Sequence, residues 1–254
     1  MTAAPEYLAS IDEVPGWFFP PDTLLFVAID DMQTSRGITG DLLEIGVFQG
    51  RCAILMGCLA RPGERLVVCD LFEDMAGIDE ENKAERLYNS ELHELPVPAR
   101  ADFERCYLRY HESLPEIHQR PSSELDQVLP AGSFRIVHVD GGHTYNVAKR
   151  DLETARHLLG PGGIVIFDDW SNSQAPGIAL AIWEEYLKGE LIPLCFTPMK
   201  FYATWDPSGL TADEINAWAA RQPDIVPTFA QQLLGREACH FNMSGDFWSR
   251  HSLG

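Results

Sequence analysis

Short, almost wholly apolar runs recur along this chain, with helix-forming stretches between them. Two clear examples are Leu66–Cys69 and Ile164–Phe167. A strand that is apolar on both faces is typical of a parallel sheet that is covered on both sides. Strands that alternate with helices predict the α/β fold class, in which helices pack on both faces of a mostly parallel sheet.

The pattern predicts seven strands, at residues 42–45, 66–69, 114–118, 134–139, 164–167, 191–196 and 199–204. It predicts helices at residues 22–36, 50–59, 101–109, 145–159, 177–188 and 212–221. Asp22 is expected to cap the first helix, and residues 160–163 (GPGG) are expected to end the fourth. Residues 71–100 are polar and acidic without a clear period, so we expect a partly helical insertion there. The pattern assigns nothing beyond residue 221.

Charge and cysteine content limit the partners and the location of the protein. The 254 residues carry 38 acidic and 19 basic side chains, and the net charge of −19 disfavours binding to nucleic acid. The six cysteines form no CxxC pair and fit no zinc spacing, so we expect free thiols in a reducing cytoplasm. Residues 1–6 show no signal peptide, and the apolar run Leu24–Ile29 is too short to span a membrane.

The turn after the first predicted strand has features of a nucleoside site. Residues 44–50 read EIGVFQG, in which Gly46 permits a tight turn and Gly50 permits close packing of the next helix. Phe48 stands where a dinucleotide motif has its second glycine, which argues against NAD or FAD. Asp70 ends the second predicted strand, 24 residues after Gly46, where a carboxylate can accept hydrogen bonds from ribose hydroxyls. Together they predict a ligand that contains adenosine.

Ser122 and Ser123 follow the third predicted strand, at the same edge of the sheet. Their hydroxyl groups suit the polar edge of an adenine ring. A second interpretation is equally open, in which one of the two serines caps a short helix that runs through Val128.

Three acids follow the next two strands. Asp140 ends the strand at 134–139, and Asp168 and Asp169 end the strand at 164–167. Three carboxylates in one small space repel one another unless a cation binds among them. Oxygen ligands of this kind favour Mg²⁺ or Mn²⁺. In the alternative interpretation, Asp168 or Asp169 only caps the turn at Trp170.

His143 is the leading candidate for a general base. It lies three residues after Asp140, where its imidazole can take a proton from a hydroxyl group beside the metal. His138, inside a strand, is expected to be a core histidine.

These motifs resemble class I S-adenosylmethionine (SAM)-dependent O-methyltransferases, and in particular the metal-dependent macrocin-type enzymes that act on sugar hydroxyls. The resemblance covers about residues 35–205 and is most specific at residues 134–170. It implies that Glu44, Gly46, Gly50, Asp70, Ser122, Ser123 and Asp140 form the SAM site, that Asp140, Asp168 and Asp169 hold Mg²⁺ or Mn²⁺, and that His143 and Asp140 are catalytic. The related catechol-type enzymes have a lysine at the position of His143 and an asparagine at that of Asp169.

The resemblance also implies one Rossmann-like domain over residues 1–254, with a seven-stranded core at 38–205. We expect an N-terminal helical lid at 1–37, a C-terminal extension at 206–254 and a homo-oligomer. The acceptor is expected to be a small hydroxylated molecule, a sugar first, with an amino substrate or a phenol as alternatives. The aromatic residues that could line its pocket are Trp17, Phe18, Phe19, Trp170 and Tyr202.

Two other functions are compatible with the same residues. A metal-dependent hydrolase or hydroxylase could use the acid cluster, although non-haem iron usually takes two histidines and one carboxylate. A non-catalytic SAM-binding protein is the other, although such a relative would be expected to have lost some of the acids or His143.

Overall fold

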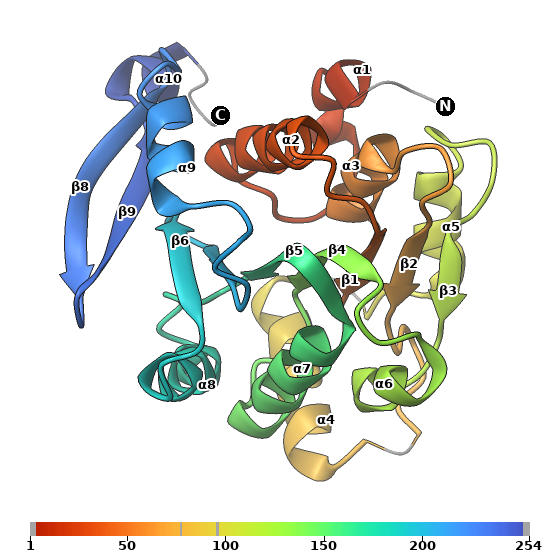
Figure 1. The fold of residues 1–254 in the computed structure, drawn as a ribbon. Coiled ribbons are helices and arrows are strands. Elements are labelled where there is room, and N and C mark those ends of the chain that lie inside the picture. The colour runs from red at the N-terminus through yellow and green to blue at the C-terminus, as the bar shows by residue number, and fades with distance from the viewer. Residues whose placement is uncertain (1–3, 77, 95–96, 251–254) are drawn as a thin grey trace.

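A single mixed sheet runs through the centre of the protein, with helices on both faces (Figure 1). The computed structural model describes residues 4–76, 78–94 and 97–250. The strands are β1 (Asp41–Ile45), β2 (Leu66–Cys69), β3 (Glu116–His118), β4 (Phe134–Val139), β5 (Leu159–Phe167), β6 (Ile192–Phe196), β7 (Phe201–Thr204), β8 (Ile225–Leu233) and β9 (Arg236–Met243). Their order is β3-β2-β1-β4-β5-β7-β6-β9-β8. The predicted α/β fold with a mostly parallel core is confirmed.

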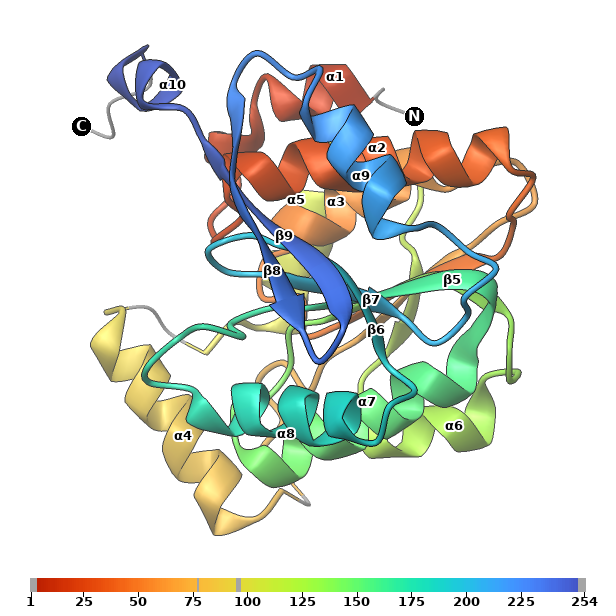
Figure 2. The ribbon, with the colours of Figure 1, turned by 60° about the vertical axis from the view of Figure 1, so that its left-hand side comes forward.

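The prediction of seven strands is wrong, because the described residues form nine. Strands β1 to β5 pair in parallel, whereas β7 pairs antiparallel with β5 and β6. The extra hairpin, β8 and β9, joins the sheet through a parallel pairing between β6 and β9. It lies at the edge of the sheet, so its strands mix polar and apolar residues (Figure 2). They therefore lack the continuous apolar runs that marked the core strands.

Each face of the sheet has its own apolar core. Residues of α1 (Ala4–Leu8), α2 (Pro20–Ser35), α3 (Arg51–Leu59), α5 (Arg100–Tyr107) and α9 (Ala212–Ala219) pack in one core. Residues of α6 (Leu125–Val128), α7 (Tyr145–Leu158) and α8 (Pro176–Leu187) pack in the other. Helix α4 (Glu80–Leu92) has no buried residue and belongs to neither core, while α10 (Gly245–Arg250) follows β9. The insertion predicted at residues 71–100 is thus partly helical.

Two local predictions are corrected. Asp22 does not cap α2, which begins at Pro20 with two prolines that lack the N–H groups a cap would satisfy. The Asp22 side chain is instead fully buried and accepts a hydrogen bond of 2.7 Å from the Tyr202 hydroxyl. The helix before residues 160–163 ends as predicted, at Leu158, but these residues belong to β5, which begins at Leu159 and not at the predicted residue 164.

The strand order reverses between β1 and β4. From β1 the chain proceeds outward to β2 and β3, and from β4 it proceeds in the other direction to β5. In an open α/β sheet, such a switch point leaves a crevice at the carboxyl ends of the strands, where ligands bind. Gly46, Asp70, Asp140 and Asp168 come directly after the four central strands, at this end of the sheet.

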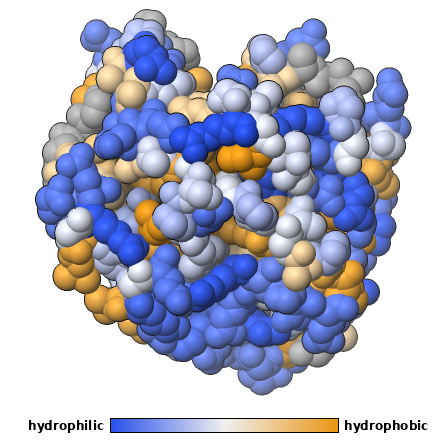
Figure 3. Space-filling view, viewed as in Figure 1, coloured by the Kyte–Doolittle hydropathy of each residue, from blue (hydrophilic) through white to orange (hydrophobic). Residues whose placement is uncertain are grey.

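The surface and the thiols also bear on the sequence predictions. The face shown in Figure 3 is mainly hydrophilic, as the acidic composition predicts. All six cysteines are free, and five of them are buried.

Among the described residues, no helix combines the length and the apolar character that a membrane span requires. Residues 1–3, which belong to the segment where the sequence predicts no signal peptide, and residues 251–254 of the expected extension lie outside the described part.

Candidate active site

A cavity of about 740 Å³ opens at the carboxyl ends of the central strands. Every site residue predicted from the sequence, except Gly50, lines this cavity: Glu44, Gly46, Asp70, Ser122, Ser123, Asp140, His143, Asp168 and Asp169. Gly50 lies just behind it at the start of α3. The structure thus brings the predicted nucleoside residues and the predicted metal residues to one site.

Gly46 closes the junction between β1 and β4. Its φ angle is +79°, and a Cβ atom there would lie 1.9 Å from the Asp140 carbonyl oxygen. The same junction holds a hydrogen bond of 2.7 Å from the Asp140 N–H to the Ile45 carbonyl. Only glycine fits this position, so Gly46 fixes the distance between the predicted nucleoside loop and the first predicted metal ligand.

Asp70 anchors the loop that Gly46 begins. Its carboxylate accepts hydrogen bonds from the Val47 N–H at 2.8 Å and the Phe72 N–H at 2.7 Å. Oδ2 also accepts from the Phe48 N–H at 3.4 Å, whereas among the described residues Oδ1 accepts only from Phe72 and can accept a further bond. Asp70 is therefore fixed in place and still able to receive the hydroxyl groups of a ribose in the cavity.

Ser122 does not cap a helix. Neither the turn at Ser122–Glu124 nor α6 has a side-chain cap, so the capping interpretation of the two serines is wrong. The Ser122 hydroxyl donates to Asp151 at 2.5 Å. Asp151 comes from α7, is fully buried and lines the cavity, and burial raises its pKa to about 7.

The three predicted metal ligands lie close together, with Asp140 at their centre. Oxygens or ring nitrogens of Asp140, Asp168 and His138 lie within 4.8 Å of one another, and so do those of Asp140, Asp169 and His143. Burial and the charges of Asp168 and Asp169 raise the pKa of Asp140 well above its ordinary value. This crowding of acids around a buried carboxyl fits a hard divalent cation. Each of these two groups contains one histidine, unlike the two-histidine set of non-haem iron.

Lys200, directly before β7, is a buried cation beside this cluster. Its ammonium group donates to Asp168 and lies 2.9 Å from His138 Nε2. Burial opposes its charge, but Asp168, Asp140 and Asp22 outweigh that effect and raise the pKa of Lys200. Lys200 therefore holds Asp168 in place and offsets one of its negative charges.

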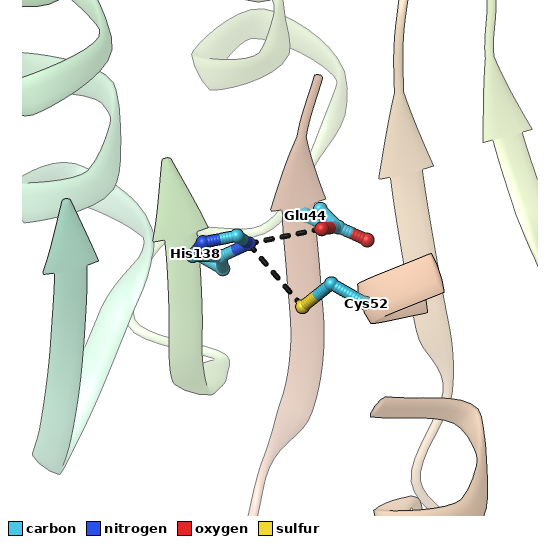
Figure 4. A group of neighbouring side chains, drawn as sticks. All are labelled: Glu44, Cys52 and His138. Carbon is cyan, nitrogen blue, oxygen red and sulfur yellow. Dashed lines mark hydrogen bonds and ion pairs between the residues drawn. The ribbon is translucent and has the colours of Figure 1, made fainter. Parts of the chain in front are cut away.

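A buried polar group below the cavity links Lys200 to Glu44. His138 lies on β4, with Nδ1 at 2.9 Å from Glu44 Oε1 of β1 and 3.5 Å from Cys52 Sγ of α3 (Figure 4). Burial raises the pKa of Glu44 to about 8 and lowers that of His138 well below its usual value. His138 is a core histidine, as expected, and it connects the floor of the predicted SAM site to Asp168 through Lys200.

His143 is held from two sides. Its Nε2 lies 3.2 Å from Asp169 Oδ2, and its Nδ1 lies 3.0 Å from Glu85 Oε1 of α4. Asn89, one turn further along α4, donates to Glu85 and lies 3.3 Å from the same ring nitrogen. Burial opposes the charge of the ring, but the bonds to Asp169 and Glu85 outweigh it and raise the pKa of His143 to about 10.

Two of the five aromatic residues proposed for the acceptor pocket line the cavity, Trp17 and Phe19. Phe18 and Tyr202 are buried in the core, and Trp170 packs against the other core. The Trp17 ring lies between Phe48, at 5.4 Å between centroids, and His93, at 4.7 Å. The N-terminal segment thus reaches across the cavity to α4.

Sequence reasoning did not identify four further residues of the site, which are Glu85, His93, Asp151 and Lys200. Glu85 and His93 fall in the acidic stretch that shows no period. Lys200 follows a Pro-Met pair in a predicted strand, where a lysine ordinarily faces solvent. Asp151 lies in a helix whose apolar positions had marked the buried side. A polar residue among them is a weak signal that sequence alone does not resolve.

Comparison with known families agrees with this architecture. A family model described as a methyltransferase domain matches residues 43–170, half of the chain. The chain belongs to this methyltransferase family, and the resemblance stated from its motifs is confirmed at that level. The matched range runs from β1 to Trp170 and therefore contains the glycine turn, Asp70 and the acid cluster.

Individual relatives are more distant. One from Streptomyces olivaceus, named 8-demethyl-8-(2,3-dimethoxy-alpha-L-rhamnosyl)-tetracenomycin-C 4'-O-methyltransferase, is 32% identical over 148 residues. The match covers 53% of this chain and 54% of the relative, so the chain spans about half of that protein's length. The O-methyltransferase NovP superposes with a TM-score of 0.56 at 20% identity, over 70% of this chain and 76% of NovP. A protein of Corynebacterium glutamicum gives 0.50 at 16% identity, over 80% and 88%. These two structures show a shared fold.

Proposed function

We propose that this protein is a SAM-dependent, divalent-metal-dependent O-methyltransferase that acts on a sugar hydroxyl of a small natural product. One observation carries the proposal: a single cavity holds the Gly46–Asp70 nucleoside features at one end and the acid cluster with His143 at the other. A methyl donor bound at the first end would present its reactive group to an acceptor at the second.

The cofactor end is formed by residues that suit SAM. Gly46 lets β1 turn tightly against the Asp140 carbonyl at the cavity, and Asp70 can receive the ribose hydroxyls. Glu44 and Asp140 line the same part of the cavity, while Gly50 positions α3 behind it. Ser122 and Ser123 lie where the adenine is expected, with Ser122 held by Asp151.

Asp140, Asp168 and Asp169 are the residues that would hold Mg²⁺ or Mn²⁺. When bound, such a cation supplies positive charge that offsets the three acids, favours the neutral form of His143 and stabilises a developing alkoxide. Lys200 keeps Asp168 oriented toward this position. An asparagine stands at the position of Asp169 in the catechol-type relatives, and the aspartate here supports a sugar over a phenol.

His143 would accept the proton of the acceptor hydroxyl as the hydroxyl oxygen receives the methyl group. Glu85 and Asn89 hold the Nδ1 side of the ring, so Nε2 faces the acid cluster where the hydroxyl is expected. The remaining task of the protein is to align oxygen, methyl carbon and sulfur, which accounts for much of the rate in such transfers.

The choice of a sugar acceptor is supported by the Streptomyces olivaceus relative, whose name describes methylation of a rhamnosyl group. A cytoplasmic location belongs to the same proposal, and six free cysteines favour a reducing compartment. A homo-oligomer remains a prediction from the unassigned ends of the sequence.

The first test is calorimetric titration with S-adenosylhomocysteine (SAH), with and without Mg²⁺, on wild type, Asp70→Ala and Asp168→Ala. We expect the wild type to bind SAH with micromolar affinity. Asp70→Ala is expected to weaken this binding at least tenfold, because a hydrogen bond from a ribose hydroxyl to a carboxylate contributes about 1.5–3 kcal/mol. Asp168→Ala is expected to change the affinity by no more than about twofold. Absence of SAH binding to the wild type would contradict the methyltransferase proposal.

The metal part is tested separately by methyl transfer. Asp168→Ala and EDTA treatment are each expected to abolish turnover, and Mg²⁺ or Mn²⁺ is expected to restore it only in the EDTA-treated wild type. Activity that survives both changes would show that the metal is not required. Iron in the purified protein would instead favour a hydroxylase.

A further inference from the structure

A buried lysine determines which nitrogen of His138 carries the ring proton. Lys200 Nζ donates to Asp168 of the acid cluster and lies 2.9 Å from His138 Nε2. An ammonium group has no lone pair, so it can only donate a hydrogen bond. Nε2 of His138 therefore accepts this bond and carries no proton. The single ring proton of the imidazole is then on Nδ1.

The Nδ1 proton is directed at Glu44. His138 and Glu44 are register partners on the neighbouring strands β4 and β1, and His138 Nδ1 lies 2.9 Å from Glu44 Oε1 (Figure 4). The His138 side chain is fully buried and that of Glu44 is 2% exposed. A histidine that is fixed in one tautomer thus holds one oxygen of Glu44 and determines where the other oxygen points.

The other oxygen of Glu44 is left without a partner. Within the described part of the chain, Glu44 Oε2 is buried and accepts no hydrogen bond. A buried acceptor that stays unpaired is costly. Glu44 and its neighbour Cys52 both line the cavity, so a molecule bound there can supply the donor that the protein does not.

The place of Glu44 in the sheet indicates what this donor is. Strand β1 lies between β2, which ends just before Asp70, and β4, which ends just before Asp140. Glu44 is therefore between the proposed ribose position and the acid cluster. In SAM, the sulfur that carries the methyl group joins the ribose to an amino-acid tail, so the tail begins in this region. Its α-ammonium group is a charged donor, which forms strong hydrogen bonds with a carboxylate.

From these contacts, and resting on the proposed function, we infer that His138 and Lys200 are positioning residues for the cofactor. Lys200 keeps the His138 proton on Nδ1, and His138 holds Oε1 of Glu44. Oε2 of Glu44 then receives the α-ammonium group of the cofactor's amino-acid tail. The same lysine contacts Asp168, so one buried cation holds a residue of each end of the cavity in place.

The tautomer is tested by long-range proton–nitrogen NMR correlation spectra of the histidine rings, recorded in EDTA so that no metal contributes. The His138 signals are identified by their absence in His138→Phe. We expect the wild-type ring to carry its proton on Nδ1, and we expect Lys200→Met to lose this tautomer. A proton on Nε2 in the wild type, or an unchanged tautomer in Lys200→Met, would overturn the inference.

The contact with the ammonium group is tested by calorimetry in EDTA with SAH and its desamino analogue, which lacks only the α-amino group. We expect the wild type to bind SAH at least about tenfold more tightly than the analogue, because hydrogen bonds between charged groups are among the strongest. His138→Phe keeps the ring contact with Phe26 and is expected to lower this ratio about fivefold, since it has no N–H for Glu44. His138→Asn, whose amide can replace the Nδ1 donor, is expected to keep most of the ratio, and Glu44→Gln to lower it at least as much as His138→Phe.

His111→Phe is the matched control, because His111 is also a buried histidine, stacks on Tyr107 and lies outside the cavity lining. It is expected to leave the ratio unchanged. A wild-type ratio near one, or a ratio that His138→Phe does not lower, would contradict the inference. An equal loss of affinity for both ligands in His138→Phe would contradict it as well, since His138 would then support the pocket as a whole. Failure of the wild type to bind SAH would instead overturn the proposed function, so the two failures are distinguishable.

Discussion

At the scale of single residues, the contact between Glu85 and His143 is the feature that most affects the proposed chemistry. The two side chains come from different elements, and Glu85 Oε1 lies 3.0 Å from His143 Nδ1. A carboxylate at this nitrogen favours the tautomer with the proton on Nδ1 and leaves Nε2 to act toward the acid cluster. Glu85 is therefore a positioning residue for the proposed base.

Removal of Glu85 is expected to lower kcat more than it changes KM. Glu85→Ala leaves His143 without its Nδ1 partner, and we expect kcat to fall about 10–100-fold, as for other residues that orient a functional histidine. Glu85→Gln keeps an acceptor oxygen, and we expect it to retain most of the activity. Steady-state kinetics and SAH titration provide the measurement, with SAH affinity expected to stay constant in both variants.

Glu81→Gln is the control for this experiment, since Glu81 is an exposed acid on the same helix and outside the cavity lining. It is expected to match the wild type. A parallel loss in Glu81→Gln, or a fall in SAH affinity in Glu85→Ala, would indicate that α4 itself has been disturbed. Unchanged kcat in Glu85→Ala would contradict the positioning role.

At the scale of elements, the junction of β1 and β4 determines whether the site can form. Gly46→Ala places a Cβ atom 1.9 Å from the Asp140 carbonyl oxygen, at a φ of +79°. Gly37→Ala is the matched control, because Gly37 has a φ of +68° and nothing within 4 Å of its Cβ position. Both variants carry backbone strain of about 1–2 kcal/mol, and only Gly46→Ala adds the clash.

We therefore expect Gly46→Ala to unfold at least about 2 kcal/mol more easily than Gly37→Ala, on the scale of an overpacked core, and to lose SAH binding. Urea unfolding and SAH titration give the two measurements. Equal stabilities for the two variants would show that the β1–β4 junction can shift without cost.

The same elements show how far the sequence could predict this fold. Strand β2 and the second half of β5 were predictable because they are apolar throughout, and Asp70 and Asp168 were predictable because each directly follows such a run. The hairpin of β8 and β9 was not, since its strands mix polar and apolar residues at an edge. Lys200 and Glu85 act only through partners 32 and 58 positions away in the chain. Such contacts depend on tertiary packing, which local patterns do not contain.

At the scale of the whole molecule, buried acids make stability depend on pH. Burial raises the pKa of Asp151 to about 7, of Asp22 to about 6 and of Glu44 to about 8. Between about pH 4 and these values the folded protein holds protons that the unfolded chain has released. The free energy of unfolding therefore falls as pH rises through this window, and it levels off above it.

Asp151→Asn isolates one of these contributions. The amide cannot ionise, and its oxygen can still accept the Ser122 hydrogen bond. We expect the variant to gain stability relative to wild type between pH 5 and pH 8, by on the order of 1–3 kcal/mol, since each unit of pKa shift corresponds to about 1.4 kcal/mol. Urea unfolding at the two pH values measures the difference. Asp31→Asn, at an exposed acid, controls for the loss of one charge from a chain of net charge −19. If Asp31→Asn gains as much, the gain comes from the loss of one negative charge and not from the buried carboxyl. If the stability difference between Asp151→Asn and wild type is the same at both pH values, the Asp151 carboxyl is ionised in the folded protein, and the cavity beside Ser122 carries one more negative charge than the burial of Asp151 implies.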